Sequence, residues 1–330
     1  MHSHHSHSGD YIAHASDSLE DIVNHAISLK FQIFCLTEHM PRYDLNHLYP
    51  EELDKNYNCC SLIKKFNDYY KHALDIKLRV NHDKNINTKI LVGIETEGGL
   101  TPLYLDKILE FKSNHAVDLI IGSIHHVNEI PIDFDRRNWV KARESCNGST
   151  RELFKTYFEL QYQLLVKLKP EVIGHFDLIR LMLINDDLDI DSNSNSNSNS
   201  KQLDPNFIEK NWPDVWEIII KNIKFIVSYG GLIELNSAAI RKGWDTPYPQ
   251  RDIVKVALEL NAKFCLSDDS HGIRQVALNY GKVLNYCKEM KINTLYYLDL
   301  NENNQVFVNS ISLDEAQRHP FWLQLDKTST

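Results

Sequence analysis

Short apolar runs alternate with longer amphipathic segments along most of this 330-residue chain, and this alternation is the strongest constraint on its fold. The apolar runs are FQIFCLTEH (31–39), ILVGIE (90–95), VDLIIGSIHH (117–126), EVIGHFD (171–177), GLIELNS (231–237) and KFCLSDDSH (263–271). Continuous apolar character over so few residues is typical of strands buried on both faces of a parallel sheet. A later run, NTLYYLDL (293–300), is a candidate for the last strand.

The segments between these runs place apolar residues three and four positions apart, which predicts helices. They cover residues 18–30, 103–113, 151–169, 214–230 and 251–262. Strands that alternate with helices form parallel βα units. Six or more such units over this length favour a closed barrel or a doubly wound sheet, so the fold class is α/β.

Composition narrows the functional classes. The chain is 42% hydrophobic and 25% charged, as expected for a globular protein with a large core. A net charge of −9 argues against binding to nucleic acid or to an anionic membrane surface. No apolar run approaches the ~18 residues of a spanning helix, no signal peptide is evident, and the cysteines lack disulfide or CxxC spacing. We therefore expect a cytoplasmic protein.

One segment cannot contribute to a core. Residues 192–200 read SNSNSNSNS and follow an acidic run that begins at Asp186. Such a composition buries too little apolar surface to fold. We expect residues 186–204 to be a disordered insertion within a single domain that spans residues 1–330.

The N-terminal segment and five of the predicted strands end, at the carboxyl side, in a residue that can bind a metal. These strand ends are HSH (5–7), TEH (37–39), GIE (93–95), SIHH (123–126), GHFD (174–177) and DDSH (268–271). In a parallel barrel the carboxyl ends of all strands converge on one face. The sequence therefore predicts that these side chains share one pocket.

Histidines cluster at the N-terminus, where His2, His4, His5, His7 and His14 lie within fourteen residues. His5 and His7 are two positions apart, so on an extended segment both rings face the same side. The pair His2 and His4 has the same geometry. Because GDYIAHASDSLEDIV runs directly into a predicted helix, we interpret this cluster as the first barrel strand and not as a tag.

The candidate ligands exceed the four that one tetrahedral zinc ion requires. They are His5, His7, His14, His39, Glu95, His125, His175, Asp269 and His271. This number suits two or three divalent ions, and imidazole with carboxylate favours Zn, Fe or Mn over Mg or Ca. Glu95 is the best candidate for a carboxylate that bridges two metals, whereas Glu38 is more simply a loop residue. Asp177 could support His175 from behind.

The order of these motifs resembles that of the PHP (polymerase and histidinol phosphatase) phosphoesterases over residues 1 to 271. MHSHHSHSGDY, CLTEHMPR, IPIDFD, IGHFDLIR, ELNSAAIRKG and LSDDSHG are more closely similar to the fungal-type monofunctional histidinol-phosphatases. The resemblance implies a TIM-like, distorted (β/α)7 barrel with a trinuclear site at the carboxyl ends of its strands. By motif, it implies one metal on His5, His7, Glu95 and Asp269, a second on Glu95, His125 and His175, and a third on His14, His39 and His271.

A phosphate ester also requires a cationic residue. Arg241 follows a predicted strand end by five residues, and a guanidinium can hold two phosphate oxygens. Family members similarly use an arginine here, while Arg42 and Arg274 are weaker alternatives. We expect Glu97 to contact the cationic part of the substrate, although a surface role is as plausible, and Asn236 to orient a ligand or a loop.

The resemblance implies hydrolysis of L-histidinol phosphate to L-histidinol and phosphate, a step of histidine biosynthesis. Glu95, Asp269 and Arg241 are the expected catalytic residues, and a metal-bridging hydroxide would attack in line. Three alternatives remain at this point: another small phosphate ester or nucleotide, a metal-dependent amidohydrolase, or metal storage without catalysis. Oligomeric state cannot be inferred from the sequence.

Overall fold

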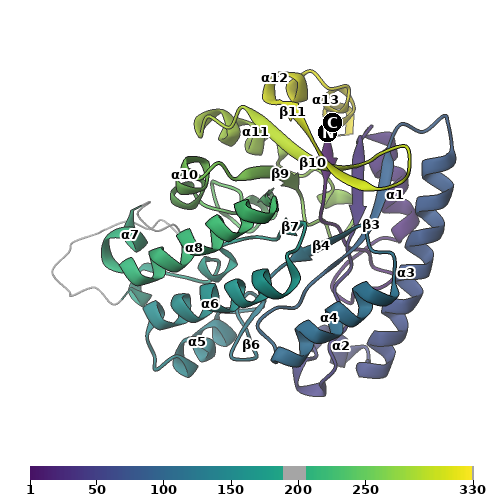
Figure 1. The fold of residues 1–330 in the computed structure, drawn as a ribbon. Helices are drawn as coiled ribbons and strands as arrows, with labels where there is room; N and C mark the ends of the chain where they lie inside the picture. Colours follow the sequence, from purple (N-terminus) through teal and green to yellow (C-terminus); the bar gives the residue numbers. More distant parts are fainter. Residues whose placement is uncertain (189–205, 329–330) are drawn as a thin grey trace.

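Seven parallel strands form the centre of the computed structural model, which describes residues 1–188 and 206–328 (Figure 1). Their order is β1 (His2–Ser3), β2 (Ile33–Leu36), β3 (Lys89–Glu95), β4 (Leu119–Gly122), β7 (Val172–Ile173), β8 (Leu232–Asn236) and β9 (Lys263–Ser267). The first and last strands also meet, because the backbone N–H of His7 donates to the carbonyl of Ser270 at 2.7 Å. The sheet therefore curves into the expected distorted (β/α)7 barrel.

Helices surround the strands (Figure 1). All five predicted helices are present: α1 (Leu19–Ser28), α4 (Pro102–Asn114), α6 (Thr150–Leu168), α8 (Pro213–Tyr229) and α10 (Arg251–Glu259). The structure adds α2 (Pro50–Asp54), α3 (Cys59–His82), α5 (Arg136–Ser145), α7 (Phe207–Asn211), α9 (Ala238–Arg241), α11 (Tyr280–Glu289), α12 (Leu313–Gln317) and α13 (Phe321–Thr328). A short hairpin of β5 (His126–Val127) and β6 (Ile130–Pro131) follows β4.

The largest element missing from the sequence prediction is α3, which spans 24 residues. Its buried side chains recur three and four positions apart, as in the other helices, so the period is present in the sequence although the prediction did not include this segment. Its Tyr69 hydroxyl lies 2.7 Å from the carbonyl of Leu36 and 2.8 Å from that of Gly93. The helix thereby ties β2 to β3 near the ends that carry the site.

The expectation that residues 293–300 form the last barrel strand was wrong. This segment is β10 (Thr294–Leu300), which pairs antiparallel with β11 (Val306–Ser312) and with no barrel strand. Tyr297, Leu298 and Leu300 instead pack against the inward-facing residues Ile33, Cys35, Leu91, Leu119, Ile121, Val172, Leu232 and Cys265. Most of these lie near the amino ends of their strands, so the hairpin closes the end of the barrel opposite the histidine and carboxylate motifs.

The acidic run before the Ser-Asn repeat is held in place at its start. Asp187 is buried and pairs with Arg136 and Arg143. Ordered structure therefore extends into the first residues of the range expected to be disordered, while residues 189–204 lie outside the described residues. Among the helices described, none is both long and apolar enough to traverse a bilayer.

Candidate active site

The N-terminal histidines divide into two pairs with different surroundings. His5 and His7 lie on either side of Ser6, which bridges to Ser270 after β9, and both rings face the carboxyl end of the barrel. The ring of His2 accepts the N–H of Leu266, and the ring of His4 accepts the N–H of Leu298. Because side chains alternate along an extended segment, His5 and His7 face the site, whereas His2 and His4 bond to neighbouring strands.

Glu95, at the end of β3, lies between two groups of histidines. Its Oε1 is 3.1 Å from Nε2 of both His125 and His175. Its Oε2 is 3.1 Å from Nε2 of His5 and 2.9 Å from Nδ1 of His39. Each oxygen therefore faces a different group, which is the arrangement needed in a carboxylate that bridges two ions.

The motif after β9 brings Asp269 and His271 to the same place. Asp269 adopts a left-handed backbone conformation (φ 49°), which Asp tolerates better than most residues. One of its carboxylate oxygens lies 3.4 Å from Nε2 of His7. The ring of His271 lies 4.5 Å from that of His7 and 4.8 Å from that of His14, measured between centroids.

The atoms that meet here do not satisfy one another as hydrogen-bond partners. Nε2 of His5, Nε2 of His7, both ring nitrogens of His39 and Oε2 of Glu95 are buried without a hydrogen bond in the described structure. Burying unpaired polar atoms is costly. Ligand atoms of four groups lie within 4.8 Å of one another: His7/His39/His271, His5/His7/Asp269, His39/Glu97/His125 and Glu95/His125/His175. This donor set fits divalent transition metals.

Two buried carboxylates and one that is partly exposed, Asp133, lie beside the outer nitrogen of three rings. Glu234 lies 3.3 Å from Nδ1 of His5, Glu38 lies 3.3 Å from Nδ1 of His7, and Asp133 lies 3.4 Å from Nδ1 of His125. Such a carboxylate fixes the tautomer and leaves Nε2 available to a metal. The interpretation of Glu38 as a simple loop residue therefore gives way to a supporting position behind His7.

His175 is held through its backbone. Its N–H donates to Glu234 at 2.6 Å, and a Cβ on the preceding Gly174 would lie 2.1 Å from the Ser123 hydroxyl. A larger residue at this position would therefore have to displace the Ser123 side chain. Asp177 does not support the ring, because one of its oxygens accepts the N–H of Gln250 and the other has no hydrogen bond in the described structure.

Opposite charges set the protonation of the central carboxylates. Burial alone would raise the pKa of Glu95, but His5, His39 and His125 hold it well below its usual range. The pKa of Asp269 is also held low, because the nearby rings of His5 and His7 outweigh its burial. Both carboxylates are therefore ionised, as metal ligands must be.

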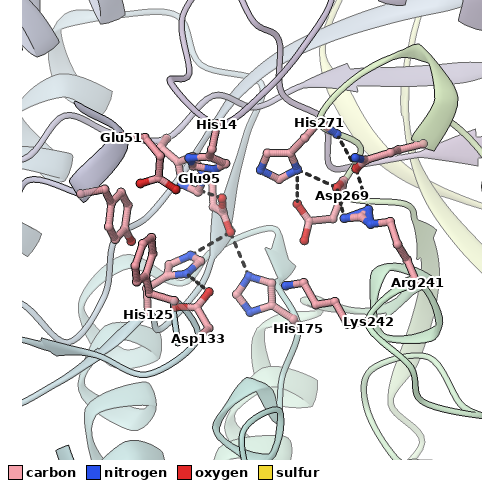
Figure 2. A pocket seen from close by; sticks show the side chains of 14 residues that line it. His14, Glu51, Glu95, His125, Asp133, His175, Arg241, Lys242, Asp269 and His271 are labelled. Carbon is pink, nitrogen blue, oxygen red and sulfur yellow. Dashed lines mark hydrogen bonds and ion pairs between the residues drawn. The ribbon is translucent and has the colours of Figure 1, made fainter. Parts of the chain in front are cut away.

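A cavity of about 310 Å³ opens onto this cluster. Figure 2 shows Glu95, His125, His175 and Asp269 at its centre. Its lining consists of His14, His39, Tyr49, Glu51, Glu95, His125, Asp133, Phe134, His175, Arg241, Lys242, Asp269, His271 and Gln275. Seven of the nine predicted ligands thus line one pocket, and His5 and His7 lie beneath it, against Glu95 and Asp269.

Arg241 reaches the cavity from α9, the short helix that follows β8. One guanidinium nitrogen donates to Oε1 of Gln275 at 2.6 Å, and another to the carbonyl of Asp269 at 3.3 Å. The neighbouring Lys242 lines the same wall (Figure 2). Two cations beside this cluster of histidines and carboxylates form a site suited to an anion.

Three predicted residues occupy other positions. His14 lines the cavity but belongs to none of the four ligand groups. Glu97 is buried behind His39, where Arg42 and the Tyr49 hydroxyl donate to its oxygens. Asn236 is buried and donates to Glu234 at 2.7 Å. Neither Glu97 nor Asn236 lines the cavity, because each is committed to its neighbours.

Sequence reasoning missed several residues of this site. Glu234 interrupts the apolar strand GLIELNS, and a buried acid there signals a partner, although not which one. Asp133 lies in IPIDFD, which was noted only as part of a family pattern. Glu51 comes from α2, a short helix outside the βα pattern, and Tyr49 directly precedes this helix. No local signal indicates that either residue reaches the cavity.

The barrel, its ring of histidine and carboxylate side chains, and the cationic wall define a hydrolase of the TIM-like class. The PHP domain model matches residues 3–238, so the chain belongs to the PHP family.

Two curated relatives extend over nearly the whole chain. The histidinol-phosphatase of Saccharomyces cerevisiae is 36% identical over 98% of this chain and 100% of its own length. A protein of Schizosaccharomyces pombe named "Probable histidinol-phosphatase" is 40% identical over 94% of each chain. A solved structure of histidinol phosphate phosphatase from Lactococcus lactis, complexed with zinc, L-histidinol and phosphate, is 16% identical and has a TM-score of 0.60. It covers 93% of this chain and 98% of its own, and it supports the fold.

Proposed function

We propose that this chain hydrolyses L-histidinol phosphate to L-histidinol and phosphate. The observation that carries the proposal is Glu95, whose two oxygens face separate groups of histidines in a cavity that Arg241 also lines. The names of the two yeast relatives support this substrate over a nucleotide or another small phosphate ester.

Three groups of residues would hold divalent metals. We assign His5, His7, Glu95 and Asp269 to one ion, Glu95, His125 and His175 to a second, and His14, His39 and His271 to a third. The close approach of these groups supports the first two assignments, and the third rests partly on ring distances around His271. Zinc, iron and manganese all suit this donor set, and zinc is bound in the Lactococcus lactis protein.

Metals bound there would supply Lewis-acid activation of the phosphoryl group and of the attacking water. The remaining work falls to side chains of the protein. Arg241, fixed by Gln275, would take phosphate oxygens through its planar fork and stabilise the charge that develops during displacement. Lys242 would add a second positive charge at the same wall. Glu38, Asp133 and Glu234 would keep the histidine rings oriented.

The remaining expectations stay proposals. All six cysteines are free thiols, and four of them are buried, which supports a reducing compartment such as the cytoplasm. The net charge predicts that the chain binds neither nucleic acid nor an anionic membrane, and this stays a prediction.

A phosphate-release assay tests the function directly. The protein loaded separately with Zn, Mn or Fe should release phosphate from L-histidinol phosphate, and Arg241→Ala should lower kcat/KM about a hundredfold while elemental analysis shows unchanged metal content. If the wild-type protein cleaves other phosphate esters but not this one, the substrate assignment is wrong. An Arg241→Ala variant with full activity would exclude the proposed role of that residue.

A further inference from the structure

The cavity has two chemically different ends. Arg241 and Lys242 form one wall, and Figure 2 shows Glu51 on the far side of the central histidines from them. Tyr49 and Phe134 line the cavity together with Glu51. A phosphate ester held by the cationic wall would therefore direct its alcohol portion toward an acidic and aromatic wall.

Glu51 differs from every other carboxylate that lines the cavity. Glu95 and Asp269 face ligand histidines, and Asp133 lies 3.4 Å from Nδ1 of His125. The Glu51 side chain has no hydrogen bond or ion pair in the part of the chain that the structure describes, although its Oε2 is buried. A buried carboxylate oxygen without a partner is costly unless a ligand supplies one.

The helix that carries Glu51 is firmly held, so its carboxylate is preorganised. The neighbouring Glu52 is buried, accepts the backbone N–H of Tyr49 at 2.8 Å and pairs with Arg42. The same arginine donates to Glu97 at 2.6 Å, and its guanidinium lies 4.4 Å from the centre of the Tyr49 ring. These contacts fix α2 at the barrel mouth without using Glu51.

Aromatic rings complete this wall. The rings of Tyr49 and Phe134 are nearly parallel, with an interplanar angle of 10° and centroids 6.2 Å apart. The Tyr49 hydroxyl donates to Glu97, so this ring cannot turn freely. Aromatic faces beside a free carboxylate form a site that attracts flat or cationic nitrogen groups.

We propose that Glu51 binds a cationic nitrogen in the alcohol portion of the substrate, so that the enzyme selects phosphate esters of amino alcohols over those of neutral alcohols. This inference rests on the proposed function, and it assigns the enzyme's choice of substrate to a residue of α2. It replaces the expectation that Glu97 plays this role, since Glu97 is already bound to Arg42 and Tyr49. A site built to pair with a charged group discriminates strongly against a substrate that lacks it.

The test compares two substrates with one variant and one control. Glu51→Gln should lower kcat/KM for L-histidinol phosphate about tenfold or more, mainly through KM, because one charge-assisted contact is lost. The same variant should hydrolyse p-nitrophenyl phosphate, whose leaving group carries no cation, within about twofold of the wild-type rate. The control is Asp54→Asn, which removes an exposed carboxylate from the same helix and should change neither reaction.

Calorimetric titration with L-histidinol supplies a readout that does not depend on turnover. Glu51→Gln should weaken histidinol binding about tenfold and leave the affinity for inorganic phosphate unchanged, and Glu51→Asp should recover part of the loss. Equal losses for both substrates, or unchanged histidinol affinity, would overturn the role of Glu51. Failure of the wild-type enzyme to cleave L-histidinol phosphate is a separate result, which would refute the proposed function itself.

Discussion

Glu234 connects three parts of the site although it does not line the cavity. It accepts the backbone N–H of His175 at 2.6 Å and the amide of Asn236 at 2.7 Å, and it lies 3.3 Å from Nδ1 of His5. Burial raises the pKa of Glu234, but His5 outweighs this effect and keeps the carboxylate ionised. The ring of His5 and the backbone at His175 therefore depend on one charge.

Glu234→Gln tests this dependence. The amide keeps the shape but loses the charge that orients His5, so we expect metal affinity to fall about 10- to 100-fold while the fold persists. Competition with a metal-binding dye would measure the affinity, and circular dichroism would check the fold. The matched control is Glu217→Gln, at an exposed position of α8. Equal metal affinity in the two variants would show that Glu234 has no such role.

At the scale of elements, the β10–β11 hairpin is the least expected part of the fold. Its strand β10 covers the inward-facing residues at the amino end of the barrel, and the N–H of Leu298 donates to the ring of His4. The hairpin thus packs against the strand segment that continues into His5 and His7. A barrel interior left open at this end would expose apolar side chains to water.

Truncation of one hairpin residue measures this packing. Leu298→Ala should lower the free energy of unfolding by about 2 to 5 kcal/mol, because a buried leucine leaves a cavity. Phe307→Ala, on the partner strand at 40% exposure, removes more atoms but should cost less. Urea unfolding followed by circular dichroism gives both values. A larger loss for Phe307→Ala would contradict the covering role of β10.

At the scale of the whole molecule, the site joins distant parts of the chain. Nε2 of His5 lies 3.7 Å from a carboxylate oxygen of Asp269, where the ends of β1 and β9 meet. Glu95 and His175 come from strands between these two. Ions held by such residues would link the first strand to the last. They would bind the folded chain and not the unfolded one, which stabilises the fold by mass action.

Metal removal should therefore lower the unfolding temperature. We expect the chelated protein to unfold at a lower temperature than the metal-loaded one, and re-addition of Zn or Mn at 100 times Kd should restore about 2.7 kcal/mol per site. Differential scanning calorimetry would measure the shift, with elemental analysis to verify removal. An identical unfolding temperature before and after verified removal would contradict a metal-linked barrel.

Much of this molecule follows from local sequence patterns. The alternation of apolar and amphipathic segments predicted the parallel strands and five helices, because side-chain period and length are properties of each segment alone. The convergence of His39, Glu95 and His125 follows from a general rule, that parallel strands bring their carboxyl ends together. The long helix α3 carries the same three-and-four spacing of buried residues but was not among the predicted helices.

The sequence by itself determined the α/β class and most of the side chains that gather at the carboxyl ends of the strands, since both depend on short-range order along each strand. Only the tertiary structure decided that Glu234 and not Asp177 lies beside the ligand rings, that β10 covers the barrel, and that Glu51 and not Glu97 faces the cavity unpaired. These outcomes depend on which residues far apart in the chain become neighbours. Long-range packing decides this, and the spacing of residues along the sequence does not reveal it.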